Sequence, residues 1–202
     1  MMRSILQEGT TLELQHINVK LPLQNSLDLE PVIPIFHEWI QNQAFSELLL
    51  DVADYRHVKE GPGVLLIGHE ADYSLDQTDG RLGVRYNRKA RFPGTNQDRL
   101  EQAIRSALNA LQKLQSDSRL QEEISFDGRS IEILINDRLL VPNNSETRNA
   151  ASRDFETLAA RLFEPDPFTI IYSTDLRRLF GVRIESPNAH TAEELLHNLH
   201  LA

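Results

Sequence analysis

Apolar and polar positions alternate over residues 11–23, which predicts a β-strand. The two leucines at the start of this segment share one phase, whereas the apolar positions from Ile17 onward are shifted by one residue. Because such a shift turns every later side chain to the opposite face, we expect a bulge near His16. Residues 31–43 instead carry apolar side chains at helical spacing, and they predict the first helix.

Two largely apolar runs follow, at residues 48–53 and 63–68, and each predicts a strand that is buried on both faces. Residues 81–89 alternate between apolar side chains and basic or polar ones, so this strand has one apolar and one basic face. Thr95 and Asp98 have the spacing of a capping box, in which each residue accepts a hydrogen bond from a free backbone N–H of the other. We therefore expect a long amphipathic helix to begin after Thr95.

The second half of the chain predicts the same order of elements. We expect a strand over residues 131–136, a helix over 145–163, strands over 168–172 and 179–184, and a final helix from residue 191. Short echoes occur at matching places: residues 73–76 (YSLD) resemble 172–175 (YSTD), and 82–85 (LGVR) resemble 180–183 (FGVR). Matching order together with matching letters predicts an internal duplication.

We therefore expect an α+β protein built from two copies of a β-α-β-β-α unit, with a mostly antiparallel sheet and helices on one face. The first copy spans residues 1–115 and contains an inserted strand pair at 47–72, and the second copy spans 120–202. The two halves are expected to pack about a pseudo-twofold axis as one compact domain. This element order resembles the duplicated modules of the GyrI and SOUL effector-binding folds, and a pair of ferredoxin-like halves is the alternative arrangement.

Composition narrows the classes of function. The 202 residues include no cysteine, which excludes disulfides, thiolate-bound metals and a cysteine nucleophile. The formal net charge of −9 disfavours binding to nucleic acid or to an anionic lipid surface. Residues 1–8 form no apolar leader, and no segment has the length of a membrane span, so we expect a cytoplasmic protein with neither nucleic-acid nor membrane partners.

Basic side chains are concentrated on one face of the strand at 81–89, and guanidinium groups bind carboxylates and phosphates through paired hydrogen bonds. The alternative is that they form cross-strand ion pairs. The inserted segment at 47–72 contains two histidines and several acids, and the second half has no counterpart of this segment, which favours a site in the first half. We expect a cleft that binds a small anionic or amphipathic molecule without catalysis, and the candidate ligand-binding residues are His57, His69, Tyr73, Arg81 and Arg85.

Two other functions remain open, although no cofactor is predicted and no catalytic motif is present. The first is a metal-assisted enzyme in which His57, His69 and Asp72 bind a divalent metal, with Glu70 as general base. This alternative requires a hairpin to place the two histidines at neighbouring strand ends. The second is a homodimeric interaction module that pairs through an edge strand or through amphipathic helices.

Overall fold

The computed structural model describes residues 12–120 and 124–200. Position 11, where the first strand is expected to begin, and the N-terminal segment 1–8 lie outside the described residues. Within the described part of the chain, every helix is too short or too polar to cross a bilayer.

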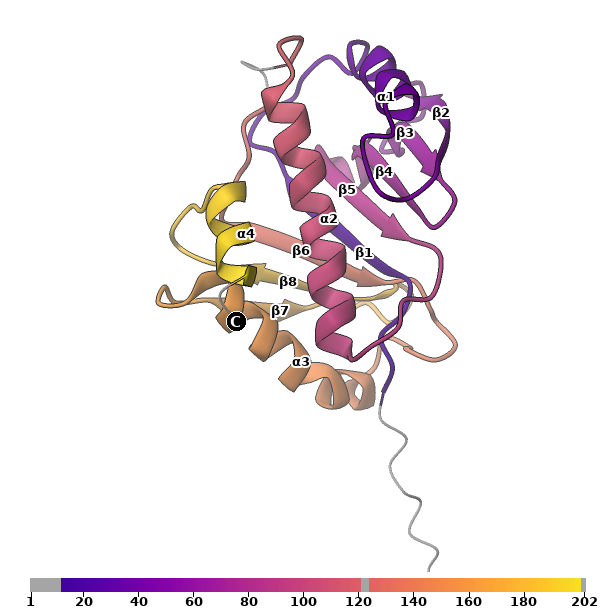
Figure 1. The fold of residues 1–202 in the computed structure, drawn as a ribbon. Coiled ribbons are helices and arrows are strands. Elements are labelled where there is room, and N and C mark those ends of the chain that lie inside the picture. The colour runs from indigo at the N-terminus through magenta and orange to yellow at the C-terminus, as the bar shows by residue number, and fades with distance from the viewer. Residues whose placement is uncertain (1–11, 121–123, 201–202) are drawn as a thin grey trace, which may run out of the picture.

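Eight strands form one sheet in which every neighbouring pair is antiparallel (Figure 1). The strands are β1 (Ile17–Pro22), β2 (Leu49–Tyr55), β3 (Gly63–Gly68), β4 (Ala71–Asp76), β5 (Gly83–Arg88), β6 (Ser130–Ile135), β7 (Thr169–Tyr172) and β8 (Phe180–Glu185). Their order across the sheet is β2-β3-β4-β5-β1-β6-β8-β7. The expected α+β class and the antiparallel sheet are thus confirmed.

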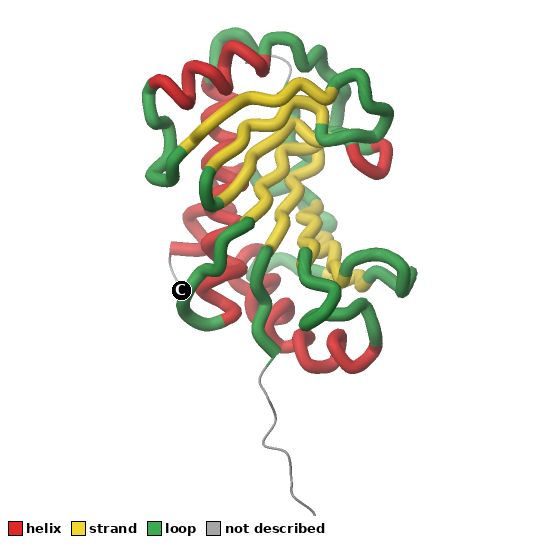
Figure 2. Tube along the Cα trace, turned by 90° about the vertical axis from the view of Figure 1, so that its right-hand side faces the viewer, coloured by secondary structure: helices red, strands yellow, loops and turns green. Residues whose placement is uncertain are grey.

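The helices cover one face of this sheet, as Figure 2 shows from the side. They are α1 (Val32–Gln41), α2 (Asn96–Ser116), α3 (Ser145–Phe163) and α4 (Ala192–His200). A short 3₁₀ turn, η1 (Thr78–Gly80), lies between β4 and β5. The central helix α2 packs against β1, β5, α3 and α4, so it connects the two ends of the helical layer (Figure 1).

The start of α2 is fixed by the expected capping box. The backbone N–H of Asp98 donates to the Thr95 hydroxyl (3.2 Å), and the Asp98 carboxylate accepts from the backbone N–H of Thr95 (2.7 Å). The apolar stripe that follows, including Leu100 and Leu111, is fully buried. Local sequence therefore sets where this helix begins and which face it buries.

The helix-facing side of the sheet forms the core. Val19 of β1 lies opposite Tyr86 of β5 and Ile133 of β6, and all three side chains are fully buried. The first strand is shorter than expected, because β1 begins only at Ile17, and its pairings with β5 and β6 show no register shift. His16, where the bulge was expected, lies just before the strand and adopts a positive φ of 52°. From Ile17 to Leu21, apolar and polar residues alternate along β1, and the apolar residues at odd-numbered positions face the helices.

Candidate functional site

The sheet face opposite the helices carries charged side chains that are buried. Lys20 on β1, Asp76 on β4 and Arg85 on β5 form one network: Asp76 accepts from the Lys20 ammonium at 2.7 Å and from the Arg85 guanidinium at 3.0 Å. The side chains of Lys20 and Asp76 are only 6% and 1% exposed. Burial by itself would raise the pKa of Asp76, but the charges of Arg85 and Lys20 outweigh it, and the pKa of this carboxyl is lowered.

This network holds η1 against the sheet. The Lys20 ammonium also donates to the backbone oxygen of Thr78 (2.8 Å), and the Arg85 guanidinium donates to the Thr78 hydroxyl (3.2 Å). The next residue, Asp79, has a positive φ of 59°, a conformation that aspartate tolerates better than most residues. The buried charges therefore fix the position from which Asp79 projects over the open face.

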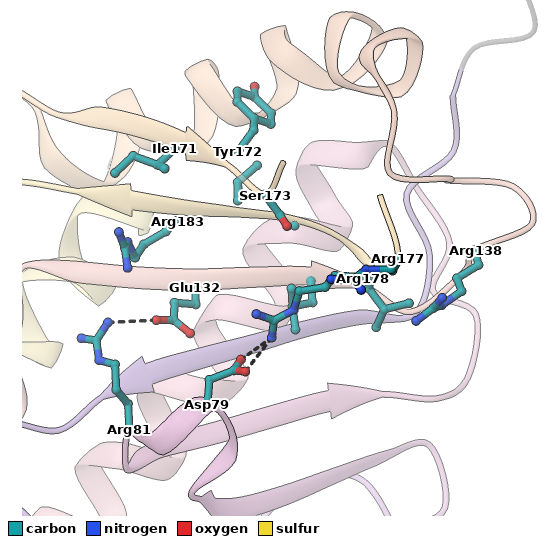
Figure 3. A pocket seen from close by; sticks show the side chains of 14 residues that line it. Asp79, Arg81, Glu132, Arg138, Ile171, Tyr172, Ser173, Arg177, Arg178 and Arg183 are labelled. Atoms are coloured by element: carbon teal, nitrogen blue, oxygen red, sulfur yellow. Dashed lines mark hydrogen bonds and ion pairs between the residues drawn. The ribbon is translucent and has the colours of Figure 1, made fainter. Parts of the chain in front are cut away.

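Asp79 meets a residue that is 99 positions away in the sequence. Arg178, on the loop between β7 and β8, donates to both carboxylate oxygens of Asp79 at 2.7 and 2.5 Å (Figure 3). This bridge crosses the open face above β1 and β6 (Figure 3). It connects the first half of the chain to the second and forms one wall of a cleft.

The cleft has a volume of about 570 Å³ and is named here the arginine cleft. Five arginines and two acids are among its lining side chains, whereas the whole chain has a net charge of −9. The lining charged residues are Asp79, Arg81, Glu132, Arg138, Arg177, Arg178 and Arg183 (Figure 3). Five guanidinium groups are therefore gathered in one cleft of an acidic protein, and those with donors left over favour an anionic ligand there.

The arginines of the cleft differ in how far their charge is compensated. Arg81 donates to Glu132 at 3.1 Å, and Arg178 is paired with Asp79. Arg183 contacts Glu185 through Nε at 2.8 Å, and its two Nη atoms have no hydrogen-bond partner among the described residues. Arg138 has neither a hydrogen bond nor an ion pair within the described part of the chain. Arg138 and Arg183 are thus the guanidinium groups best placed to accept a ligand.

The floor of the cleft is apolar because a glycine lets a leucine lie flat on the sheet. Leu134 of β6 lies opposite Gly181 of β8, and a Cβ atom at position 181 would come within 2.4 Å of Leu134 Cδ2. Ile171 of β7 adds a further apolar side chain to the same lining, and it is 38% exposed. An anion bound by the arginines would therefore lie beside apolar surface.

The loops at the rim expose further apolar side chains. Leu139 and Leu140, which follow β6, are 88% and 58% exposed, and Leu176 of the β7–β8 loop is 71% exposed. The two loops are tied together, since the Asn143 amide donates to the backbone oxygen of Asp175 at 2.9 Å. Exposed leucines on joined loops beside a cationic cleft are typical of a binding surface.

The structure separates the sequence-predicted site residues. Arg81 lines the arginine cleft, and Arg85 lies in the buried network below η1, where it forms the cross-strand ion pair of the alternative interpretation. Tyr73 is 1% exposed and points to the helical side of the sheet. His69 lines a second cleft on that side together with Tyr73. No single site brings these residues together.

The two histidines lie at opposite ends of a strand pair. His57 follows the end of β2, and His69 follows the end of β3, which runs antiparallel to β2. Six residues at about 3.3 Å each place these ends roughly 20 Å apart. The expectation that the hairpin brings them to neighbouring strand ends is therefore wrong. Asp72 instead pairs with Lys89 at 2.6 Å, and the described residues contain no group of three or more histidines and acids that could hold a metal.

Four arginines of the cleft were not among the predicted site residues, namely Arg138, Arg177, Arg178 and Arg183. Three of them, Arg138, Arg177 and Arg178, are on loops. The only sequence signal that could have pointed to them is the adjacent pair of arginines at 177 and 178. Arg183 matches Arg85 in the short echo between the two halves. Its surroundings differ, since Arg85 pairs with Asp76, while Asp175 pairs with Arg177 and not with Arg183.

Comparison with known proteins adds no family assignment. Models of known protein families give no match to the chain, and a search of curated proteins gives none either. The geometry of the cleft is therefore the ground for a functional proposal.

Proposed function

We propose that this protein binds a small amphipathic anion in the arginine cleft and performs no reaction on it. The observation that carries this proposal is Arg138, which has no acidic partner among the described residues and lines the same cleft as four further arginines, in a chain whose net charge is −9. Guanidinium groups bind carboxylate and phosphate oxygens through forked, charge-assisted hydrogen bonds. Arg183 and Arg138 are the groups proposed to make these bonds.

The chemistry of the remaining lining supports the amphipathic part of the proposal. Leu134 and Ile171 offer an apolar floor, and Leu139 and Leu176 expose apolar surface at the rim. An alkyl or aromatic group attached to the anion would cover part of this surface, at about 25 cal/mol for each Å² removed from water. A ligand with one anionic head and one apolar body matches both features.

We also infer that the two halves arose by duplication, with β1 and β6 as their adjoining strands. The strand order supports this inference, because β4-β5-β1 in the first half corresponds to β7-β8-β6 in the second. On this interpretation β2 and β3 are the insertion, and the arginine cleft lies across the junction of the halves. We further propose that each half has the topology of the GyrI and SOUL modules; such a likeness would fit effector binding but would not identify a ligand.

Isothermal titration calorimetry with three six-carbon probes tests the proposal: hexanoate, hexyl phosphate and neutral hexanol. We expect the two anions to bind and hexanol to bind at least tenfold more weakly. Arg183→Gln should weaken binding of both anions at least tenfold. Arg153→Gln is the matched control, since Arg153 is exposed on α3 outside the cleft and loses the same charge. Equal binding of hexanol, or equal effects of the two variants, would contradict the proposal.

A homodimer is the second candidate function, and the edge strand β2 favours it. Leu50 and Tyr55 of β2 are 51% and 40% exposed, and Leu48 just before it is 58% exposed. An unpaired edge strand with exposed apolar residues is prone to pair with another copy. Sedimentation equilibrium tests this, because Leu50→Lys should convert a dimer to a monomer. A wild-type protein that is still monomeric at a protein concentration of about 100 micromolar would remove this candidate.

A further inference from the structure

A second cleft lies on the helical side of the sheet, away from the arginine cleft. Its volume is about 1140 Å³, and it runs between the exposed side of α2 and the segment 44–48 that connects α1 to β2. The turn between β3 and β4 closes one part of it. We call it the helix-side cleft. Its features do not depend on the function proposed for the arginine cleft.

One carboxyl group in this cleft is only partly satisfied. Glu47 is hydrogen-bonded to the hydroxyl of Tyr73 through Oε1, while Oε2 is shielded and has no hydrogen-bond partner among the described residues. Burial raises the pKa of Glu47, and the nearby charges of Glu70 and Asp72 raise it further, against the lowering effects of the Tyr73 hydrogen bond and of Arg88. A positively charged hydrogen-bond donor at this carboxyl would relieve both the missing hydrogen bond and the negative field.

An ammonium group that has no carboxylate partner among the described residues lies in the same cleft. Lys113 of α2 is exposed, and its Nζ lies 5.6 Å from the centre of the Phe45 ring. The Phe45 ring is stacked on Tyr73, with centroids 4.5 Å apart. The Tyr73 hydroxyl is bonded to Glu47, the Tyr73 ring stacks on Phe45, and Lys113 lies near Phe45, so the two stacked rings lie between Glu47 and Lys113. An acid, an aromatic ring and a base therefore line the same cleft.

The other charged groups of the cleft are already compensated. Glu70 pairs with Arg88 at 3.0 Å, and Glu101 pairs with Arg161. Asp98 accepts hydrogen bonds from Thr95 in the capping box. Glu47 and Lys113 are therefore the lining groups with opposite charge that have capacity left for a ligand.

We propose that the helix-side cleft binds a zwitterionic molecule whose ammonium group meets Glu47 and whose carboxylate meets Lys113, with its apolar body over Phe45. The ligand class is an amino acid with its two charged groups separated by a short aliphatic or aromatic spacer. A bound ammonium supplies a counter-ion for the Glu47 carboxylate, and a bound carboxylate supplies a counter-ion for Lys113. A molecule with only one charged end leaves the other group unpaired, so it binds more weakly.

Nuclear magnetic resonance titrations of the full chain test this proposal with 4-aminobutyrate, 6-aminohexanoate and 8-aminooctanoate as probes. Hexylamine and hexanoate serve as the one-ended analogues. Binding is read from the amide signals of residues 44–48 and of α2, so that any hexanoate in the arginine cleft is recorded separately at β7 and β8. We expect at least one amino acid of the series to bind at least tenfold more tightly than both analogues.

Two charge variants separate the two ends of the ligand. Glu47→Gln should lower the affinity for the amino acid to that for hexanoate, and Lys113→Gln should lower it to that for hexylamine. Glu146→Gln, an exposed change of the same charge at the start of α3, should leave both affinities unchanged. Lys113 lies on the exposed side of its helix, so its variant tests the proposal even where Glu47→Gln perturbs folding. Amino acids that bind no better than the analogues, or a Lys113→Gln protein with wild-type affinity, would overturn it.

Discussion

Lys20 reaches Asp76 across a glycine. The two residues are on β1 and β4, which are separated by β5, and Asp76 lies opposite Gly83 of that strand. A Cβ atom at position 83 would lie only 2.9 Å from Lys20 Cε, so a side chain there would block the path of the lysine. The absence of that side chain is what allows a fully buried ion pair of 2.7 Å to form across an intervening strand.

Asp76→Asn is expected to lower the free energy of unfolding strongly. The variant removes the charge that compensates buried Lys20, and breaking a buried ion pair from one side costs about 3–5 kcal/mol. Urea denaturation followed by circular dichroism at pH 7 measures the loss. The control is Asp79→Asn, because the pair of Asp79 with Arg178 is more than half exposed and such pairs contribute about 1 kcal/mol or less. Similar losses in both variants would contradict the assignment of the buried network as the main anchor.

The same network predicts how stability depends on acid. The pKa of Asp76 is lowered in the folded protein from its ordinary value of 3.8, so the unfolded chain binds a proton first as the pH falls. The stabilising contribution is therefore fully present above about pH 4 and is lost as the pH falls through the lowered folded pKa. Unfolding curves measured from about pH 7 down to about pH 3 should therefore show that the difference in free energy of unfolding between wild type and Asp76→Asn shrinks as the pH falls. A constant difference would mean that Asp76 does not titrate in this way.

Gly181→Ala is expected to disturb the floor of the arginine cleft. The new methyl group would lie 2.4 Å from Leu134 Cδ2, so the leucine must move out of the floor and toward the cleft. Overpacking of this kind costs about 1–3 kcal/mol. Thermal unfolding measures this cost, and titration with hexanoate should show weaker binding because the cleft is narrower.

A double variant separates this effect from a change in the backbone. Leu134→Ala removes the atom that the new methyl group meets, so Gly181→Ala in the Leu134→Ala background should cost less than Gly181→Ala alone. The measured quantity is the coupling energy of the cycle. Additive effects would show that the backbone oxygen of Ile133, 3.0 Å from the added Cβ, decides the outcome instead.

Local signals in the sequence predicted the elements well because their causes are local. The capping box of Thr95 and Asp98 is confirmed by reciprocal hydrogen bonds, and α3 has the expected bounds. The final helix also begins where it was expected, and Thr191 and Glu194 form the same kind of reciprocal pair there. The position of the irregularity before β1 was equally visible, since the change of phase coincides with the positive φ of His16. Each of these features depends on residues within about four positions of one another.

The arginine cleft depends on contacts that no local pattern contains. Asp79 and Arg178 are 99 positions apart, and they meet because β6 and β1 are neighbours at the centre of the sheet. Arg138 lies on a loop, where the periodicity of a strand or helix gives no information on direction. The predicted proximity of the two histidines was wrong for a related reason. His57 lies in the turn at one end of the β2–β3 pair, and His69 lies in the turn at the other end. Topology, which fixes these distances, was not available from spacing alone.

Glu47→Gln is expected to change stability in a way that depends on pH. Burial raises the pKa of Glu47 above its ordinary value of 4.5, so the folded protein holds this proton more tightly than the unfolded chain does. The stabilising effect of the protonated form is fully present below pH 4.5 and is lost as the pH rises through the raised folded pKa.

Glutamine stays neutral and its amide oxygen can still accept from the Tyr73 hydroxyl, so the variant avoids this loss. Its free energy of unfolding relative to wild type should therefore rise between pH 4 and pH 8, by about 1.4 kcal/mol for each unit by which the pKa is raised. Urea denaturation across that pH range measures the change, and a relative stability that is flat or falls with pH would show that Glu47 ionises as an ordinary surface carboxyl.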